Sequence, residues 1–459
     1  MNNLSRHGWR IWRTVAVAAA GLALAAGAAA CSSSGGSASS GGSGSTAASG
    51  GASSIAAALQ QPATLTFWAW APQSKDIVAA FEKQYPKVKV NLVNAGTAAD
   101  EYTKLDNAIK AGSGAPDVAQ IEYYALPQFA LEGSLADLTS LGLGSAQSQY
   151  SKAVWDSVDI NGQLVGLPQD TGPMALFYNK KIFDKYKLTV PATWADYVAD
   201  AKKLHAASPK EFITNDAGDA GFVTSMIWAA GGHPYATSGT KNVSINLQDA
   251  GSKKWAGLWG PLVSGGLVSP IPSWSTQWYQ GLANGSIASL VTGAWMPVNL
   301  ETGVPAGKGD WRVAPMPEWT TGQPATAENG GSADSVIKQG KNQLAAAGFL
   351  QFMNTGPGAQ MSADSGDFPS ANTIINSGTF LSQAPAYFGG QQINKVLAQS
   401  AASVLPGWNY LPFQVYANSI FPDTVGQAYS KGTSLDSGLQ SWQQQSASYG
   451  TQQGFSISS

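Results

Sequence analysis

The chain has 459 residues, 44% of them apolar, and a formal net charge of −2. This length and composition predict a globular protein with room for two large lobes or about three domains. Charged residues make up only 12%, and the absence of basic runs argues against nucleic acid or an anionic membrane face as a partner. The single cysteine, Cys31, excludes an intramolecular disulfide. With only three histidines, a metal site built from histidine and cysteine is close to excluded, and no metal or cofactor is expected.

Residues 1–30 have the pattern of an export signal. A short stretch with three arginines precedes an alanine-rich apolar run, Val15 to Ala30. Residues 28–31, Ala-Ala-Ala-Cys, resemble a bacterial lipobox without its usual leucine, so Cys31 is predicted to carry a lipid that anchors the protein to the outer face of the cell membrane. Plain cleavage at an Ala-x-Ala site is the alternative.

The stretch from Ser32 to Ser54 contains only serine, glycine, alanine and threonine. Such a composition cannot bury a core, so residues 31–62 are predicted to be a flexible tether. Its reach is about 25–30 Å by random-coil scaling. A tether of this kind lets a protein reach a partner in the same membrane, and a spacer without a partner is the alternative.

A βαβαβ unit follows the tether. Strands are predicted at residues 64–70, 88–92 and 117–121, and helices at 77–84 and 101–111. This order predicts a mainly parallel sheet with right-handed crossovers. In open sheets of this type, ligands bind outside the carboxyl ends of the strands.

Aromatic and acidic side chains lie at two of these strand ends. Trp68 and Trp70 end the first strand, and Glu122, Tyr123 and Tyr124 follow the third. A pyranose ring places its apolar face against an aromatic ring, while its hydroxyl groups need planar polar partners. These residues therefore favour a sugar, although core packing is the better interpretation of any single tryptophan.

The stretch from Gly162 to Lys180 predicts a crossing between two sheets. Residues 164–167 and 174–178 form two apolar runs, and a polar segment with a glycine and a proline, residues 169–173, separates them. This is the pattern of a protein with two lobes and a ligand between them. A strand-turn-strand within one domain is the alternative.

The rest of the chain alternates helices and strands. Helices are predicted at residues 181–186, 194–204 with Thr193 as N-cap, 246–263 and 342–353. Strands are predicted at 287–291 and 335–337, and residues 311–318 are predicted to be a short strand followed by prolines. Trp255 and Trp259, one turn apart, are predicted to pack in the core. Trp295 follows a strand end, and a polar-flanked segment carries Trp274 and Trp278.

The order of these segments resembles the extracytoplasmic solute-binding proteins of ABC transporters, in the carbohydrate-binding family that includes maltose-binding protein. The resemblance is carried, from residue 63 onward, by LTFWAW, FEKQYP, AGSGAPDVAQIEYYALPQFALEGSLADLTSL, NGQLVGLPQDTGPMALFYNKKIFDKYKLTVPATWADYVADAKKL, GSIASLVTGAWM and NGGSADSVIKQGKNQLAAAGFLQFM.

The resemblance implies an α/β fold of the type II periplasmic-binding-protein class. Two hinged lobes, each with a mainly parallel sheet flanked by helices, would comprise residues 63–170 with 324–355 and residues 171–323 with 356–459. By the same resemblance, the ligand would contact Glu122, Tyr123, Asp170, Thr171, Tyr178, Trp295, Gly331 and Ser332. Further candidates, in segments where relatives vary, are Trp228, Trp274, Trp278 and Trp408.

The predicted function is therefore capture of a neutral sugar between two lobes by a monomer, for delivery to the transmembrane subunits of an ABC importer. The sixteen tryptophans favour an oligosaccharide that lies across several rings. A secreted glycosidase is the second hypothesis, because aromatic rings and carboxylates also describe such sites. The plausible acids of the cleft are few: Glu122, Asp170, Glu301 and Glu328. None of them lies in a recognisable catalytic motif. A binder of peptides or polyamines is the third hypothesis. The identity and length of the sugar do not follow from the sequence.

Overall fold

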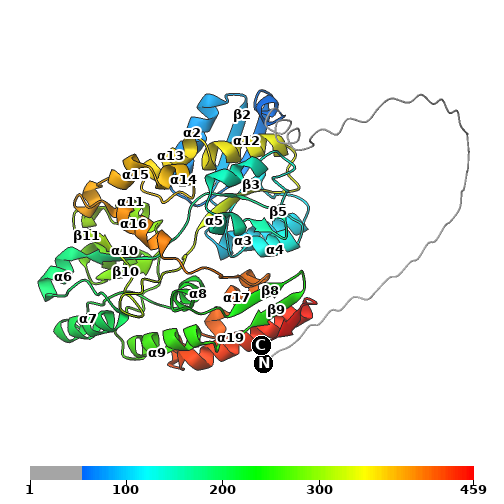
Figure 1. Ribbon diagram of the computed structural model, residues 1–459. Coiled ribbons are helices and arrows are strands. Elements are labelled where there is room, and N and C mark those ends of the chain that lie inside the picture. The colour runs from blue at the N-terminus through cyan, green and yellow to red at the C-terminus, as the bar shows by residue number, and fades with distance from the viewer. Residues whose placement is uncertain (1–53, 459) are drawn as a thin grey trace, which may run out of the picture. The chain divides into compact units, whose positions relative to one another are not determined.

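The structure, a computed structural model, describes residues 54–458 (Figure 1). The predicted signal peptide, Cys31 and residues 31–53 of the predicted tether lie outside the described residues. Residues 54–62 are described, and the prediction of a flexible tether is wrong for them, because the apolar side chains of Ile55 and Leu59 are buried in the core of the first lobe. Within the described residues the chain forms two lobes, with one apolar core in the first lobe and two in the second. None of the helices in residues 54–458 is long and apolar enough to cross a membrane.

The first lobe is built on a five-stranded sheet of order β2-β1-β3-β12-β6. Its strands are β1 (Ala63–Trp68), β2 (Val88–Val93), β3 (Val118–Glu122), β12 (Ser332–Val336) and β6 (Leu167–Pro168). β1 pairs in parallel with β2 and β3, whereas β12 runs antiparallel to β3 and β6. Pro168 lacks an N–H group and lies on the edge strand, where a proline is tolerated.

Helices cover this sheet and close the core of the first lobe. α12, from the second half of the chain, lies beside α2 and β1 (Figure 1), and its buried Phe349 packs edge-on against Phe67 and Phe81. The remaining elements of this lobe are α2 (Ser74–Gln84), α3 (Ala99–Lys110), α4 (Leu126–Leu131), η1 (Gly144–Gln149), α5 (Lys152–Asp156), β4 (Asp159–Ile160), β5 (Gln163–Leu164) and α12 (Gln343–Asn354). α13 (Pro357–Asp364) packs against α12 and α2.

The second lobe contains two small sheets. One has the order β10-β7-β11 and the other β13-β9-β8. The strands are β7 (Ala175–Asn179), β8 (Tyr235–Ser238), β9 (Asn242–Ile245), β10 (Ser289–Thr292), β11 (Trp311–Ala314) and β13 (Ser456–Ser458). Trp255 and Trp259 are fully buried in this lobe, which confirms the prediction that they pack in the core.

Many short helices surround these sheets. In the first half of the lobe they are α6 (Lys180–Tyr186), α7 (Trp194–Ala207), α8 (Ala220–Ala229), α9 (Ala250–Ser264), α10 (Thr276–Asn284), α11 (Met296–Gly303) and η2 (Pro305–Gly307). Toward the C-terminus they are α14 (Asn372–Ile375), α15 (Gly378–Ser382), η3 (Ala386–Phe388), α16 (Ile393–Ala402), α17 (Gln414–Ser419), η4 (Phe421–Asp423), α18 (Gln427–Lys431) and α19 (Leu435–Gln452). Thr193 caps α7 in a capping box with Asp196, as predicted.

The prediction of a mainly parallel sheet in each lobe is wrong for the second lobe. β10 and β11 both run antiparallel to β7. The reason is the connectivity: β7 begins where the chain arrives from the first lobe, whereas β10 ends at that same edge, next to Trp295. β12 is reversed in the first lobe for the same reason. The carboxyl ends of β3 and β10 therefore both face the region where the chain passes between the lobes.

Candidate functional site

Three stretches of chain pass between the lobes and lie side by side. We call them the crossing segments: residues 169–174, 326–331 and 366–371. Backbone hydrogen bonds join the first to the second, from Asn329 N–H to the oxygen of Gly172 at 2.7 Å. The first and third are joined by the N–H of Thr171, which donates to the oxygen of Phe368 at 3.2 Å. The lobes are thus connected by a narrow, hydrogen-bonded ribbon, which is the arrangement of a hinge.

Asp170 lies at the centre of this ribbon. Its side chain is only 6% exposed, and its Oδ1 accepts the N–H of Ser332 at 2.9 Å. Its backbone oxygen accepts the hydroxyl of Tyr123 at 2.9 Å. Burial, reinforced by the nearby carboxylate of Asp367, raises the pKa of Asp170 well above its usual range. Asp170 therefore ties the crossing segments to the carboxyl end of β3.

Two glycines make this close packing possible. A Cβ atom on Gly172 would lie 2.2 Å from the backbone oxygen of Asn329. Gly331 has a φ of 95°, a conformation that side chains rarely adopt, and a Cβ there would lie 2.8 Å from the ring of Tyr123. Gly331, just before β12, is thus the point at which the second crossing segment meets the first lobe.

Polar groups gather where β10 ends, next to the second crossing segment. Trp295 donates its indole N–H to the oxygen of Asn329 at 2.6 Å. The Asn329 side chain accepts from Thr292 Oγ1 at 3.1 Å and donates to Ser225 Oγ at 3.2 Å. The adjacent Glu328 has a buried Oε2 without a hydrogen-bond partner. We call these residues the polar centre: Ser225, Thr292, Glu328 and Asn329.

An aromatic row lies on one side of the polar centre. Trp228, one turn after Ser225 on α8, stacks on Trp408 with ring centroids 5.1 Å apart. Trp408 packs edge-on against Tyr410, and Tyr410 packs against Tyr124 of the first lobe with centroids 6.3 Å apart. From Tyr124 the row continues within the first lobe through Tyr102 to Trp70. Tyr410 therefore brings an aromatic ring of the second lobe into contact with the first.

Carboxyl groups from both lobes converge on this row. Glu122, at the end of β3, accepts a hydrogen bond from the hydroxyl of Tyr102 at 3.1 Å. Burial raises the pKa of Glu122 to about 7, and the negative charge of Asp219 from the second lobe contributes to this rise. Burial raises the pKa of Glu328 to about 8. Burial raises the pKa of Tyr410, and the negative charges of Glu328 and Glu122 contribute to this rise.

A second aromatic group lies next to Trp295. Trp274 packs against Trp295 and Trp278, with ring centroids 5.6 Å and 5.1 Å away. Trp278 is buried and donates its N–H to Asn215 Oδ1 at 2.7 Å, so it supports Trp274 from behind. Trp274 itself is 49% exposed. Aromatic rings therefore lie on two sides of the polar centre.

The remaining predicted contact residues lie at different places. Thr171 and Ser332 are buried in the crossing region. Trp68 is half-buried against the core of the first lobe. Tyr178 lies near the carboxyl end of β7, which points away from the crossing segments, and its ring packs on Phe183 with centroids 4.9 Å apart. The structure therefore does not bring Tyr178 to the polar centre.

Several residues of this region were not predicted from the sequence as ligand contacts. They are Asp219, Ser225, Thr292, Asn329 and Tyr410. Tyr410 follows Trp408 by two positions, so a wider window around Trp408 would have included it. Nothing in the sequence near Asp219, which acts as the N-cap of α8, indicates that it approaches Glu122.

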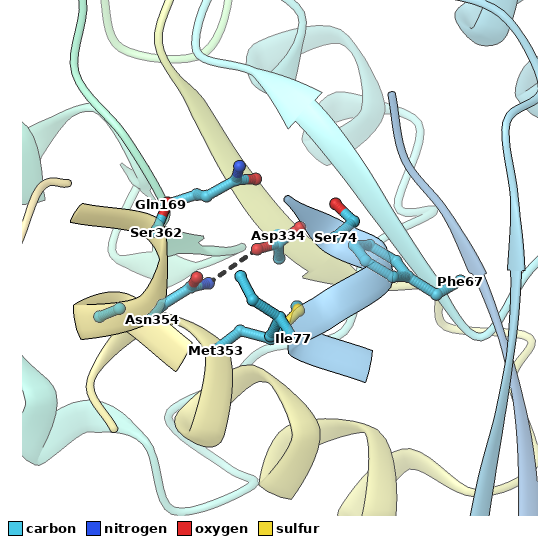
Figure 2. Close-up of a pocket in the computed structure, with 9 residues that line it drawn as sticks. Phe67, Ser74, Ile77, Gln169, Asp334, Met353, Asn354 and Ser362 are labelled. Atoms are coloured by element: carbon cyan, nitrogen blue, oxygen red, sulfur yellow. Dashed lines mark hydrogen bonds between the residues drawn. The ribbon is translucent and has the colours of Figure 1, made fainter. Parts of the chain in front are cut away.

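A small cavity lies behind the hinge, and both polar and apolar side chains line it (Figure 2). Its walls include Gln169, Asp334, Asn354 and Ser362, and its volume of about 10 Å³ suits one water molecule. Asn354 donates to Asp334 Oδ2 at 2.9 Å, whereas the buried Oδ1 has no protein partner. A second cavity of about 370 Å³ lies beside His205 and Asp216. Neither cavity is lined by a residue predicted to contact sugar.

The hinge carboxyl groups predict that the protein is more stable in mild acid. Burial raises the pKa of Asp334 from 3.8 to about 7, and the pKa of Asp367 is also raised by burial. Between pH 3.8 and about pH 7, the folded state therefore binds more protons than the unfolded state. The free energy of unfolding then falls as the pH rises through this range. We expect a higher Tm at pH 5 than at pH 8 in a calorimetric pH series.

Asp334→Asn provides the matched control for this prediction. The amide keeps the shape of the carboxyl group and an oxygen that can accept from Asn354, but it does not titrate. We expect the variant to have a shallower dependence of Tm on pH than the parent protein. The same dependence in both proteins would show that Asp334 does not take up a proton on folding.

Comparison with known proteins agrees with this geometry. Residues 66–361, more than half of the chain, match the family of bacterial extracellular solute-binding proteins. The chain belongs to this family. Its likeness to solved structures confirms the two-lobed, type II periplasmic-binding-protein fold.

Among the similar structures is the ABC-transporter-associated binding protein of Bifidobacterium animalis subsp. lactis, in complex with β-1,6-galactobiose. It is 44% identical, with a TM-score of 0.84 over 86% of this chain and 99% of that one. The galacto-N-biose-/lacto-N-biose I-binding protein of Bifidobacterium longum, in complex with lacto-N-biose, is 28% identical, with a TM-score of 0.75 over 86% and 98%. The arabinooligosaccharide-binding protein of Bacillus subtilis is 28% identical over 63% of this chain and 68% of its own length.

Proposed function

We propose that this protein captures a neutral, galactose-containing oligosaccharide between its lobes and delivers it to an ABC importer. The observation that carries the proposal is the 44% identity, over nearly the full length of both folds, with a protein solved in complex with β-1,6-galactobiose. The polar centre, with aromatic rings on two sides, supports the same ligand chemistry. Pyranose faces stack on indole rings, and carboxyl and amide groups hydrogen-bond to hydroxyl groups.

Residues of both lobes contribute to the proposed site. In the first lobe, Glu122 and the ring of Trp70 would meet the sugar, and in the second lobe Glu328 and the indole groups of Trp228, Trp295 and Trp408 would do so. The unpartnered Glu328 Oε2 can hydrogen-bond to a hydroxyl group of the sugar. We assign Asp170, Thr171, Tyr123, Gly331 and Ser332 to the hinge, where their polar or backbone groups hold the crossing segments.

Capture then works by a shift in population. A sugar that contacts both lobes binds the closed form more tightly than the open form, and this difference in affinity drives closure. We propose that the lobes exchange chain at the crossing segments. The first two lie close to the boundaries predicted from the sequence, whereas the third begins at residue 366 instead of the predicted 356, because α13 packs against α12 and α2 of the first lobe. The closed monomer is the form that the transmembrane subunits of the importer would recognise.

Isothermal titration tests this proposal against its alternatives. We expect heat from β-1,6-galactobiose, and none from tripeptides or polyamines at the same concentration. Chromatography of the sugar after overnight incubation separates binding from hydrolysis, because a glycosidase needs two carboxyl groups that flank one bond. Unchanged sugar supports a binding protein, and released galactose supports a glycosidase.

We further propose that Cys31 carries a lipid that anchors the protein to the outer face of the cell membrane. The support is the lipobox-like sequence before Cys31 and the Ser/Gly-rich stretch after it. We expect mass spectrometry of the mature N-terminus to find a diacylglyceryl group on Cys31. An unmodified cysteine, or cleavage elsewhere, contradicts the anchor.

A further inference from the structure

Trp274 combines two unfavourable features. It is 49% exposed, and its φ is 68°, a left-handed backbone conformation that costs energy for any residue with a side chain. The other described non-glycine residues with positive φ are the smaller or more flexible Ala98, Asn161 and Lys187. A tryptophan in this conformation persists only where the surrounding structure holds it, and such strain is concentrated at ligand sites.

The residues on either side of Trp274 are firmly held. Ser273 Oγ accepts the amide N–H of Asn215 at 2.9 Å. Ser275 caps α10 by accepting the N–H of Trp278 at 3.2 Å, and Trp278 in turn donates to Asn215. Asn215 thus fixes the loop on both sides of Trp274. The exposed indole is therefore presented in one orientation by its neighbours.

Trp274 extends the aromatic surface beyond Trp295. Trp295 contacts the second crossing segment through its bond to Asn329 and contacts Trp274 through its ring. The indole group of Trp274 packs against Trp295 and the buried Trp278. About half of the Trp274 surface is open to solvent. The distance of 5.6 Å between the Trp274 and Trp295 ring centroids is on the scale of one sugar unit.

We propose that Trp274 is a chain-length determinant that stacks on a sugar unit beyond the disaccharide held at the polar centre. The inference rests on the proposed function, since it needs a saccharide at that centre. A disaccharide satisfies the polar centre and Trp295, and a third unit lies over the exposed face of Trp274. The protein then prefers longer oligosaccharides because each stacked ring adds to the binding free energy.

Titration with β-1,6-galactobiose and β-1,6-galactotriose tests this inference. In the parent protein we expect tighter binding of the trisaccharide. Trp274→Ala should weaken trisaccharide binding at least tenfold and by at least fivefold more than disaccharide binding, whereas Trp274→Phe, which keeps a ring, should retain most of the preference. Val190→Ala removes another exposed apolar side chain of the second lobe and should leave both affinities unchanged.

Equal losses for the two sugars, or no loss for either, overturn the chain-length role while leaving sugar binding itself intact. Absence of binding to the parent protein overturns the proposed function together with this inference. The backbone strain at Trp274 can be tested separately by thermal unfolding, because glycine adopts positive φ freely. We expect Trp274→Gly to have a higher Tm than Trp274→Ala, and the opposite order would contradict the strained conformation.

Discussion

Gly172→Ala is expected to destabilise the protein and to weaken sugar binding at least tenfold. The new methyl group would lie 2.2 Å from the oxygen and 2.9 Å from the carbonyl carbon of Asn329. Both are backbone atoms of another crossing segment, so the two segments must move apart. This breaks the hydrogen bond from Asn329 to Gly172. Overpacking of this kind costs about 1–3 kcal/mol of unfolding free energy, measured by urea denaturation.

The effect on affinity follows from the position of Gly172 in the hinge. A changed spacing of the crossing segments alters how the lobes meet, although Gly172 has no side chain to contact the sugar. Gly257→Ala is the matched control, because Gly257 is exposed within α9 and a Cβ there meets no atom within 4 Å. That variant should gain about 0.5–1 kcal/mol and bind normally. Unchanged stability and affinity in Gly172→Ala would contradict the hinge geometry.

Trp295→Ala is expected to weaken sugar binding at least tenfold, a loss of about 1.4 kcal/mol. The substitution removes the ring on which a pyranose would stack and frees the oxygen of Asn329 beside the polar centre. Titration calorimetry measures the affinity, and a thermal melt in the absence of sugar shows whether the fold is retained. An affinity within twofold of the parent protein would remove Trp295 from the site.

Two further variants separate stacking from hydrogen bonding. Trp295→Phe keeps an aromatic face and loses the bond to Asn329, so it should bind more tightly than Trp295→Ala. Trp319→Phe changes a half-buried tryptophan that packs on Trp194 and lies under Lys254, outside the proposed site. Its affinity should equal that of the parent protein. If Trp319→Phe weakened binding as much as Trp295→Ala, the losses would not report on the site.

Local patterns were sufficient to predict much of the fold. Alternating apolar residues in β1 and β2 and the apolar stripe of α12 each depend on a few neighbouring positions, and the structure agrees with them. The side-chain cap of Thr193 on α7 is a local interaction as well. The crossing at residues 169–174 could be found because a polar stretch with glycine and proline separates two apolar runs.

Other features depend on long-range pairing that no local pattern contains. The antiparallel direction of β10 and β11 follows from where the chain enters and leaves the second lobe. Asp170 was expected to meet the ligand, whereas its carboxylate accepts the N–H of Ser332, 162 residues away in sequence. The contact between Tyr410 and Tyr124 likewise joins distant segments.

A neutral saccharide held by residues of both lobes should close the hinge at the crossing segments. Small-angle X-ray scattering of the protein, titrated with β-1,6-galactobiose and β-1,6-galactotriose, tests this claim most directly. We predict a saturable decrease in the radius of gyration at the sugar concentrations that produce heat in calorimetry. Saturable binding with no change in the radius of gyration would contradict closure of the two lobes around the sugar.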